Sequence, residues 1–170
     1  MYIPDESGIN SLGGFAYQIK VFVSYMLSMD EGMQAEFETV DDIAISKMTS
    51  DIIDDNEDKF RNLIVSANGI KAIQVKRTSI TEKVAKQVLF NWMLLEKSGK
   101  TITNYILFTD KSYKNSDIVF DVSAEVLYEE ILNSKKSEKA TITKIKKEYE
   151  NDKYRFLNVY ERVKNKYTFM

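Results

Sequence analysis

The spacing of apolar residues switches from helical to strand-like several times along this chain, and the order of these switches constrains the fold most. Between residues 13 and 26, apolar side chains recur at helical spacing, which predicts a helix opening at Gly13-Gly14 and ending near residues 30–32. Residues 35–47 alternate with period two, which predicts one strand, kinked at the acidic step 41–42.

Two further β-rich runs, residues 63–67 and 70–76, flank Asn68-Gly69. Because Asn-Gly tolerates positive φ at both positions, a hairpin with a two-residue type I′ turn is expected there. A capping box from Ser79 to Glu82, with Thr81 as the alternative cap, precedes an apolar helical pattern.

That helix is expected to end near residues 98–99 and to be followed by a strand over 102–108. A helix over 124–132, capped by Asp121 or Ser123, comes next. The tail from Thr141 predicts one long helix, or two that break near residues 151–152.

Collected in order, these elements give one α/β domain over residues 1–170. Helices before and after the strands predict a layered core around a mixed sheet. The chain length suits a single domain rather than two. No signal sequence or apolar run long enough for a membrane span is found, so a cytoplasmic, non-membrane protein is expected.

The chain contains no His and no Cys, which restricts its chemistry. Zinc fingers, iron–sulfur clusters, disulfides and nucleophilic sites built on Cys or on a Ser–His pair are excluded. Any catalysis must use carboxylates, Lys, Arg, amides, hydroxyls and a hard metal that prefers oxygen ligands.

The formal net charge of −2 conceals an asymmetry. Residues 1–60 hold 3 basic and 13 acidic side chains, a net of −10, whereas residues 61–170 hold 21 basic and 13 acidic side chains, a net of +8. An acidic part that collects divalent cations and a basic part that meets phosphates would suit a metal-dependent enzyme acting on nucleic acid. Two solvated faces are the alternative.

The strand over 70–76 carries polar residues at an unusual place. Period two puts Gln74 and Lys76 on one face, about 7 Å apart, and burying them requires partners. Asp42 on a neighbouring strand can supply a carboxylate, so Asp42, Gln74 and the Val75 backbone carbonyl could converge on Mg²⁺. Lys76 would then orient or deprotonate the attacking water and offset charge on the phosphate.

This arrangement resembles the PD-(D/E)xK nuclease superfamily, whose restriction-endonuclease-like core has the order αβββαβ. Asp42 matches its metal-binding Asp, and Gln74-Val75-Lys76 matches its E/Q-x-K element. The resemblance implies Mg²⁺-dependent hydrolysis of phosphodiester bonds, with Mn²⁺ as a substitute.

Four further segments look like one branch of this superfamily, the N-terminal endonuclease domain of CBASS-type bacterial anti-phage effectors. The matches span residues 14–110, with a helical part over 121–170, and consist of Gly14-Phe15-x-Tyr17-Gln18, residues 37–45, residues 73–76 and Phe108-Thr109-Asp110. The branch implies cleavage of double-stranded DNA in anti-phage defence, oligomerisation as a homo-oligomer, and a sensor domain or partner protein outside this chain.

The chain departs from the family at Gln74, which replaces Glu and removes one charge from the metal site. Glu38 could restore that charge or be a solvated strand residue, and Asp41 lies next to the metal-binding Asp42. Gln18 could hydrogen-bond a metal-bound water, as the first helix does in the family, or be an ordinary surface residue.

Basic and hydroxyl side chains follow the Lys76 strand and could contact DNA phosphates. They are Arg77, Thr78, Ser79, Lys83 and Lys86. A solvated helix face is the alternative for these residues, and a non-catalytic nuclease fold that binds nucleic acid or a partner protein is the alternative for the whole chain. An RNA-directed nuclease would use the same site.

Overall fold

The computed structural model describes residues 7–30, 33–38, 41–47, 69–77, 80–110, 112–134 and 141–170. These residues form the expected α/β fold, with five α-helices and a five-stranded mixed sheet. The elements in chain order are α1 (Ser7–Ser28), β1 (Met33–Phe37), β2 (Ile43–Lys47), β3 (Ile70–Lys76), α3 (Glu82–Leu95), β4 (Ile102–Thr109), the 3-10 turn η1 (Ile118–Phe120), α4 (Ala124–Leu132), α5 (Thr141–Tyr149), α6 (Lys153–Asn165) and β5 (Tyr167–Phe169). No helix among these residues is long and apolar enough to cross a membrane.

The sheet has the strand order β1-β2-β3-β4-β5. The pairs β1–β2 and β2–β3 are antiparallel, whereas β3–β4 and β4–β5 are parallel. The parallel step from β3 to β4 is made through α3, which is the usual crossover for parallel neighbours. The first six elements therefore follow the order αβββαβ.

The single strand expected over residues 35–47 is wrong, because the chain reverses at the acidic step. Phe37 pairs with Ile43, and the Glu38 N–H donates to the Asp42 carbonyl at 3.0 Å. Glu38 adopts φ 59°, a left-handed conformation that turns the chain between the two strands. The expected strand over residues 63–67 lies outside the described residues.

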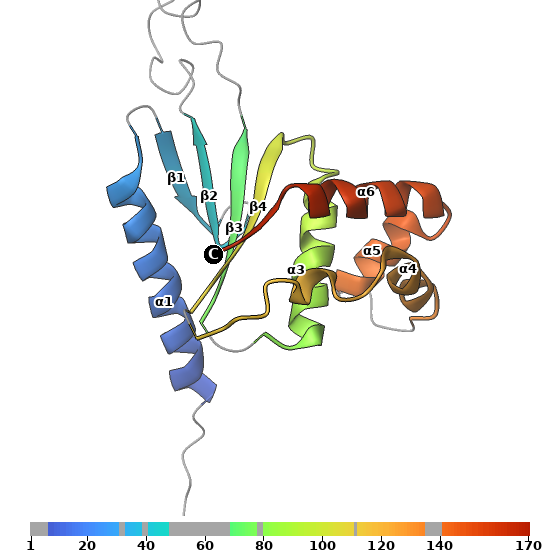
Figure 1. The fold of residues 1–170 in the computed structure, drawn as a ribbon, viewed down its shortest axis with the longest axis horizontal. Helices are drawn as coiled ribbons and strands as arrows, with labels where there is room; N and C mark the ends of the chain where they lie inside the picture. Colours follow the sequence, from blue (N-terminus) through green and yellow to red (C-terminus); the bar gives the residue numbers. More distant parts are fainter. Residues whose placement is uncertain are drawn as a thin grey trace, which may run out of the picture.

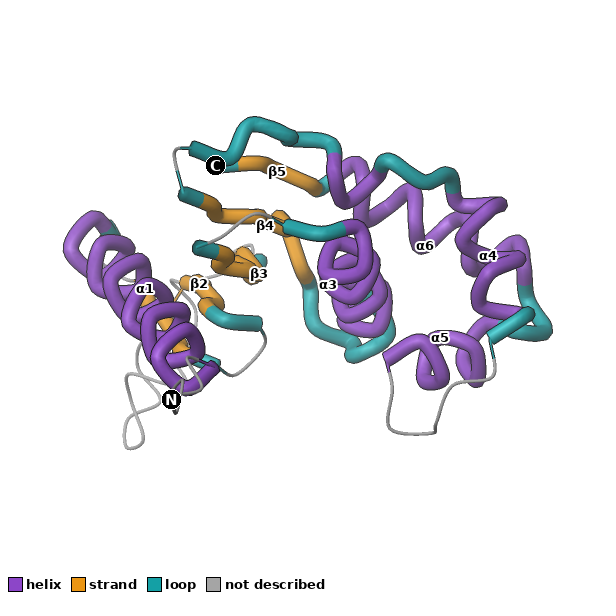
Figure 2. The backbone as a smooth tube through the Cα atoms, turned by 90° about the horizontal axis from the view of Figure 1, so that it is seen from below, coloured by secondary structure: helices purple, strands orange, loops and turns teal. Residues whose placement is uncertain are grey.

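The sheet separates two apolar layers (Figures 1 and 2). Helix α1 covers one face, where Val21 packs against Ile43, Ile45, Ile73 and other apolar side chains. Helix α3 covers the other face over β3 and β4, and α4, α5 and α6 pack outside α3. Because side chains alternate along a strand, residues 72, 74 and 76 of β3 face the α3 side.

Helix starts differ from expectation at two places. Helix α1 begins at Ser7, so Gly13-Gly14 lies inside it rather than at its opening. The N-cap of α3 is Thr81, whose hydroxyl accepts the Val84 N–H at 3.4 Å, and the Ser79 capping box is therefore wrong. Ile80 and Ala85 explain the choice, since both are buried in the core next to the Thr81 cap.

Gly69 is needed because the chain just before β3 passes close to the Thr103 side chain of β4. A Cβ atom at this position would lie 2.0 Å from Thr103 Cγ2 on β4, and among the described glycines only Gly99 has positive φ. The type I′ conformation expected at Gly69 is therefore wrong, and Asn68 lies outside the described residues.

The tail forms two helices, α5 and α6, broken at residues 150–152. Asp152 caps α6 by accepting the Arg155 N–H at 2.9 Å. The chain then enters β5, an edge strand that the sequence did not predict, and Tyr167 pairs with Tyr105 of β4. Helix α4, expected over residues 124–132 before this tail, is capped by Ser123 rather than by Asp121.

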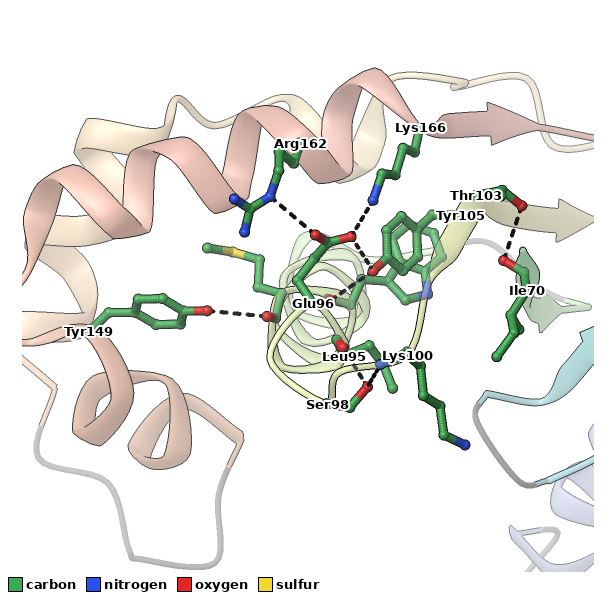
Figure 3. Close-up of polar contacts among 12 residues, drawn as sticks. Ile70, Leu95, Glu96, Ser98, Lys100, Thr103, Tyr105, Tyr149, Arg162 and Lys166 are labelled. Carbon is green, nitrogen blue, oxygen red and sulfur yellow. Dashed lines mark hydrogen bonds and ion pairs between the residues drawn. The ribbon is translucent and has the colours of Figure 1, made fainter. Parts of the chain in front are cut away.

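Glu96, just after α3, connects that helix to α6 and β4 (Figure 3). Its carboxylate accepts hydrogen bonds from the Tyr105 hydroxyl at 2.9 Å, Lys166 Nζ at 2.7 Å and Arg162 Nε at 3.1 Å. Burial raises the pKa of Glu96, but the bonds from Lys166 and Tyr105 outweigh it, so the pKa is lowered overall. The charged carboxylate therefore fixes the end of α6 where the chain turns into β5.

Candidate active site

Asp42 lies at the start of β2, directly across from the middle of β3. Ile43 pairs with Ile73, so the preceding Asp42 faces Gln74. Oδ2 of Asp42 accepts a hydrogen bond from Gln74 Nε2 and another from the Val75 N–H at 2.7 Å. The structure thus brings together Asp42, Gln74 and Val75, three of the residues that the sequence selected.

The buried Gln74 amide has a defined role in this contact. Gln74 is 5% exposed, and its amide N–H₂ group is committed to a carboxylate, which is a charge-assisted bond. Oδ1 of Asp42 accepts no hydrogen bond from any residue that the structure describes. Two donors, one from a side chain and one from the backbone, therefore hold Oδ2 of the Asp42 carboxylate in place.

Asp41 adds a second carboxyl group beside Asp42. Its Oδ2 accepts the indole N–H of Trp92 at 2.6 Å, and Trp92 is fully buried in the core under α3. Burial raises the pKa of Asp41 to about 6, with a further upward contribution from the charge of Asp42, against a downward contribution from the Trp92 bond. A carboxyl group with such a pKa gains from any cation placed near it.

Lys76 lies two residues beyond Gln74 on the same side of β3. It is half-buried, and its positive charge acts on Asp41, where it lowers the pKa of that carboxyl group. Lys76 forms no ion pair with any residue in the described ranges.

Strands β1 and β2 also carry polar side chains on this sheet face. Gln34 Nε2 donates to Glu36 Oε1 at 3.1 Å and to Ser46 Oγ at 3.2 Å. Glu36 pairs with Ala44, which puts it on the Asp42 side, whereas Phe37 packs under α1. Glu38 is exposed and belongs to the turn. Glu36 is thus a polar neighbour of the site that the sequence reasoning missed.

The other sequence-selected residues lie apart from Asp42. Gln18 is on α1, across the sheet from the face that carries Gln74. Arg77 also lies on the α1 side, where a Cβ atom added at Gly13 would come within 2.7 Å of its guanidinium. Lys83 is exposed on α3, and Lys86 is ion-paired with Glu82 at 2.8 Å and Glu130 at 2.6 Å. Thr78 and Ser79 lie outside the described residues.

A hydroxyl contact fixes α1 to the end of β4. Tyr17 Oη donates to the Thr109 carbonyl at 3.2 Å. Burial raises the pKa of Tyr17, the charge of Asp110 raises it further, and the charge of Arg77 lowers it. These residues surround the ends of β3 and β4 on the α1 side.

The donor set of the Asp42 site is made of oxygen atoms, which suits a hard cation such as Mg²⁺. It comprises the carboxylates of Asp41 and Asp42, since Gln74 turns its amide nitrogen toward Asp42 as a donor. Within the described ranges no three acidic side chains gather around one point, so a cation here would depend on backbone carbonyls and water for its remaining ligands. The charge of Asp42 adds to burial in raising the pKa of Asp41, so a cation near this pair would stabilise the ionised form of Asp41.

The sequence matches no model of a known protein family, and it matches none of the curated proteins or solved structures compared with it. The functional argument therefore rests on the arrangement of side chains described above.

Proposed function

We propose that this chain is a Mg²⁺-dependent endonuclease that hydrolyses phosphodiester bonds of double-stranded DNA. The observation that carries the proposal is the contact of Asp42 with Gln74 and Val75, beside Asp41 and with Lys76 on the same face. The resemblance to anti-phage effector nucleases adds bacterial defence as the proposed setting.

Each side chain has a role in this proposal. Asp42 and Asp41 would hold the cation through carboxylate oxygens, and Gln74 would hold Asp42 in position. The chemistry supplied by a hard divalent cation is Lewis-acid stabilisation of charge on phosphate oxygens. Lys76, as an ammonium group, would orient the attacking water by hydrogen bonding to it and balance the negative charge that develops on the phosphate.

The surroundings of Lys76 support the approach of DNA toward the polar side chains that β1 and β2 carry on this sheet face. Strands β1 and β2 carry the polar side chains of Gln34, Glu36 and Ser46 there, whereas α3 covers β3 and β4. Lys83 on α3 is the exposed basic residue best suited to contact a phosphate, because Lys86 is already ion-paired. DNA binding should therefore weaken with salt.

The test is cleavage of supercoiled and linear DNA with Mg²⁺, in the presence and absence of EDTA. Wild-type protein should cut both substrates only without EDTA, and Asp42→Asn and Lys76→Ala should abolish cutting. Lys71→Ala is the matched control, because Lys71 is an exposed lysine on the same strand, at its opposite end. Cutting by either site variant at the wild-type rate would refute the assignment.

The Gln74 contact also favours a second candidate. An amide satisfies Asp42 without any cation, as would suit a nuclease fold that has lost catalysis and only binds nucleic acid or a partner protein. Such a module would bind DNA in a salt-dependent way that EDTA leaves unchanged, and would cut neither DNA nor RNA with Mg²⁺ or Mn²⁺. Cutting of RNA alone would instead identify the third possibility, an RNA-directed nuclease.

A further inference from the structure

Helix α1 exposes an apolar face on the side that points away from the sheet. Six large apolar side chains on this face are between 40% and 84% exposed. They are Leu12, Phe15, Ile19, Val23, Met26 and Leu27. Their spacing of three and four residues puts them in one stripe along the helix.

The opposite side of α1 is apolar as well, because it covers the sheet. Val21, Tyr17, Phe22 and Tyr25 pack against the β-strands there. Lys20 is the one charged residue in the whole of Ser7–Ser28. An apolar helix face is normally buried, and among the residues that the structure describes no element covers this outer stripe of α1.

The size of the exposed face indicates what can cover it. The six side chains together expose roughly 600 Å² of mainly apolar surface, at the upper end of the largest patches on typical monomers. With the neighbouring backbone and small side chains this approaches the ~800 Å² that each partner buries in a standard protein interface. A membrane-surface helix would instead present basic residues beside its apolar face, and α1 has only Lys20.

We propose that a second copy of this chain covers the face, with α1 packed against α1 of the partner around a two-fold axis. A second copy offers an equally apolar surface of the same length, about 33 Å for 22 residues. The face also continues to the edge of the sheet, where the Phe15 ring contacts the Phe37 ring of β1 at 5.7 Å between centroids.

The symmetry sets the register of the two helices. The stripe runs from Leu12 to Leu27, so an antiparallel pair overlaps fully when the axis passes near Ile19. Ile19 then lies opposite Ile19 of the partner subunit. Leu12 lies opposite Met26 of the partner subunit. This inference does not depend on the proposed nuclease activity.

The first test is the mass of the full chain in solution, measured by light scattering after size exclusion. The wild type should show twice the mass of the 19.7-kDa chain. Ile19→Glu and Val23→Glu should each shift the protein to the monomer without changing its circular dichroism. Val126→Glu is the matched control, because Val126 is a 57% exposed apolar residue on α4, and it should stay dimeric.

The second test uses the absence of Cys, which lets a single introduced thiol report its own neighbour. Under mild oxidation Ile19→Cys should form a disulfide-linked dimer, whereas Leu12→Cys should do so only when mixed with Met26→Cys. A monomeric wild type, a dimer that survives both Glu substitutions, or a monomer that binds vesicles of phosphatidylcholine and phosphatidylglycerol through α1 would each overturn the proposal. Disulfide crosslinking of the Cys variants also decides the question if the Glu variants fail to fold.

Discussion

Replacing Gln74 with Glu separates a metal site from a purely structural contact. In the wild type, the Gln74 amide donates to Asp42 Oδ2 at a site where Gln74 itself is almost fully buried. Gln74→Glu removes that donor and puts a second carboxylate against the first. Without a cation the variant should therefore unfold more easily than the wild type.

The expected size of the effect follows from two contributions. A hydrogen bond to a charged group contributes about 1.5–3 kcal/mol. The repulsion between two carboxylates about 4 Å apart, at an effective dielectric constant near 20, can reach about 4 kcal/mol and falls when the new side chain rotates away. A net loss of about 3–5 kcal/mol corresponds to a decrease of roughly 6–20 °C in Tm for a domain of this size.

Divalent cation should reverse this loss, because Gln74→Glu would add a carboxylate ligand beside Asp42, where the Gln74 amide nitrogen only holds Asp42 in position. At a cation concentration of about 100 times Kd, binding to the folded state returns about 2.7 kcal/mol. The assay is thermal unfolding in EDTA and in Mg²⁺, with Gln74→Met as the control that loses the donor and gains no charge. Equal Tm values for Gln74→Glu and wild type in EDTA, or a Mg²⁺ response no larger than that of Gln74→Met, would refute the reasoning.

Two further perturbations test the surroundings of the site and of the sheet. The pKa of Asp41 is raised to about 6 from 3.8, so its ionisation destabilises the fold increasingly as pH rises from about 4 through 6. Asp41→Asn still accepts the hydrogen bond from Trp92. In urea unfolding this variant should therefore be more stable than the wild type by up to about 3 kcal/mol at pH 7, and equally stable below pH 4. A stability difference that stays constant across pH would contradict this. Gly69→Ala should lower the free energy of unfolding by about 1–3 kcal/mol, because its Cβ would clash with Thr103. Gly14→Ala should raise it by about 0.5–1 kcal/mol, because no atom lies within 4 Å of the added Cβ. Equal effects of the two substitutions would show that packing at these glycines is irrelevant.

The elements around the site were predictable where local pattern and tertiary packing agree. The strand β3 has its expected bounds, and the helix α3 ends three to four residues before the expected position, because period two and helical spacing there match the faces that are buried. The proximity of Asp42 to Gln74 was expected, as ligands of one cation, once the two strands were assumed to share a sheet, but the direct hydrogen bond between them was not. That assumption holds, because β2 and β3 are direct neighbours.

The turn at residues 38–42 was missed because local alternation continues through it. Phe37, Ile43 and Ile45 do share a face, as expected, but they do so from two paired strands rather than from one. Only the pairing of β1 with β2, together with positive φ at Glu38, reveals the reversal. Glu36 rather than Glu38 then falls on the face of the site.

Contacts between distant segments were the other part that the sequence could not supply. Trp92 looked like one more apolar residue of a core helix, yet its indole N–H bonds Asp41, 51 residues earlier. The strand β5 has three residues and depends on β4 for its hydrogen bonds. Neither feature leaves a local pattern.

The most direct test of the central claim, a cation held by Asp41 and Asp42, uses the fluorescence of Trp92. Trp92 is the chain's one Trp, and its indole donates to Asp41, so its emission should titrate with a midpoint near pH 6 and lose this titration in Asp41→Asn. A cation favours the ionised carboxylate, so Mg²⁺ should move the midpoint to lower pH. If the fluorescence titration curves recorded with and without Mg²⁺ superimpose, the account is contradicted.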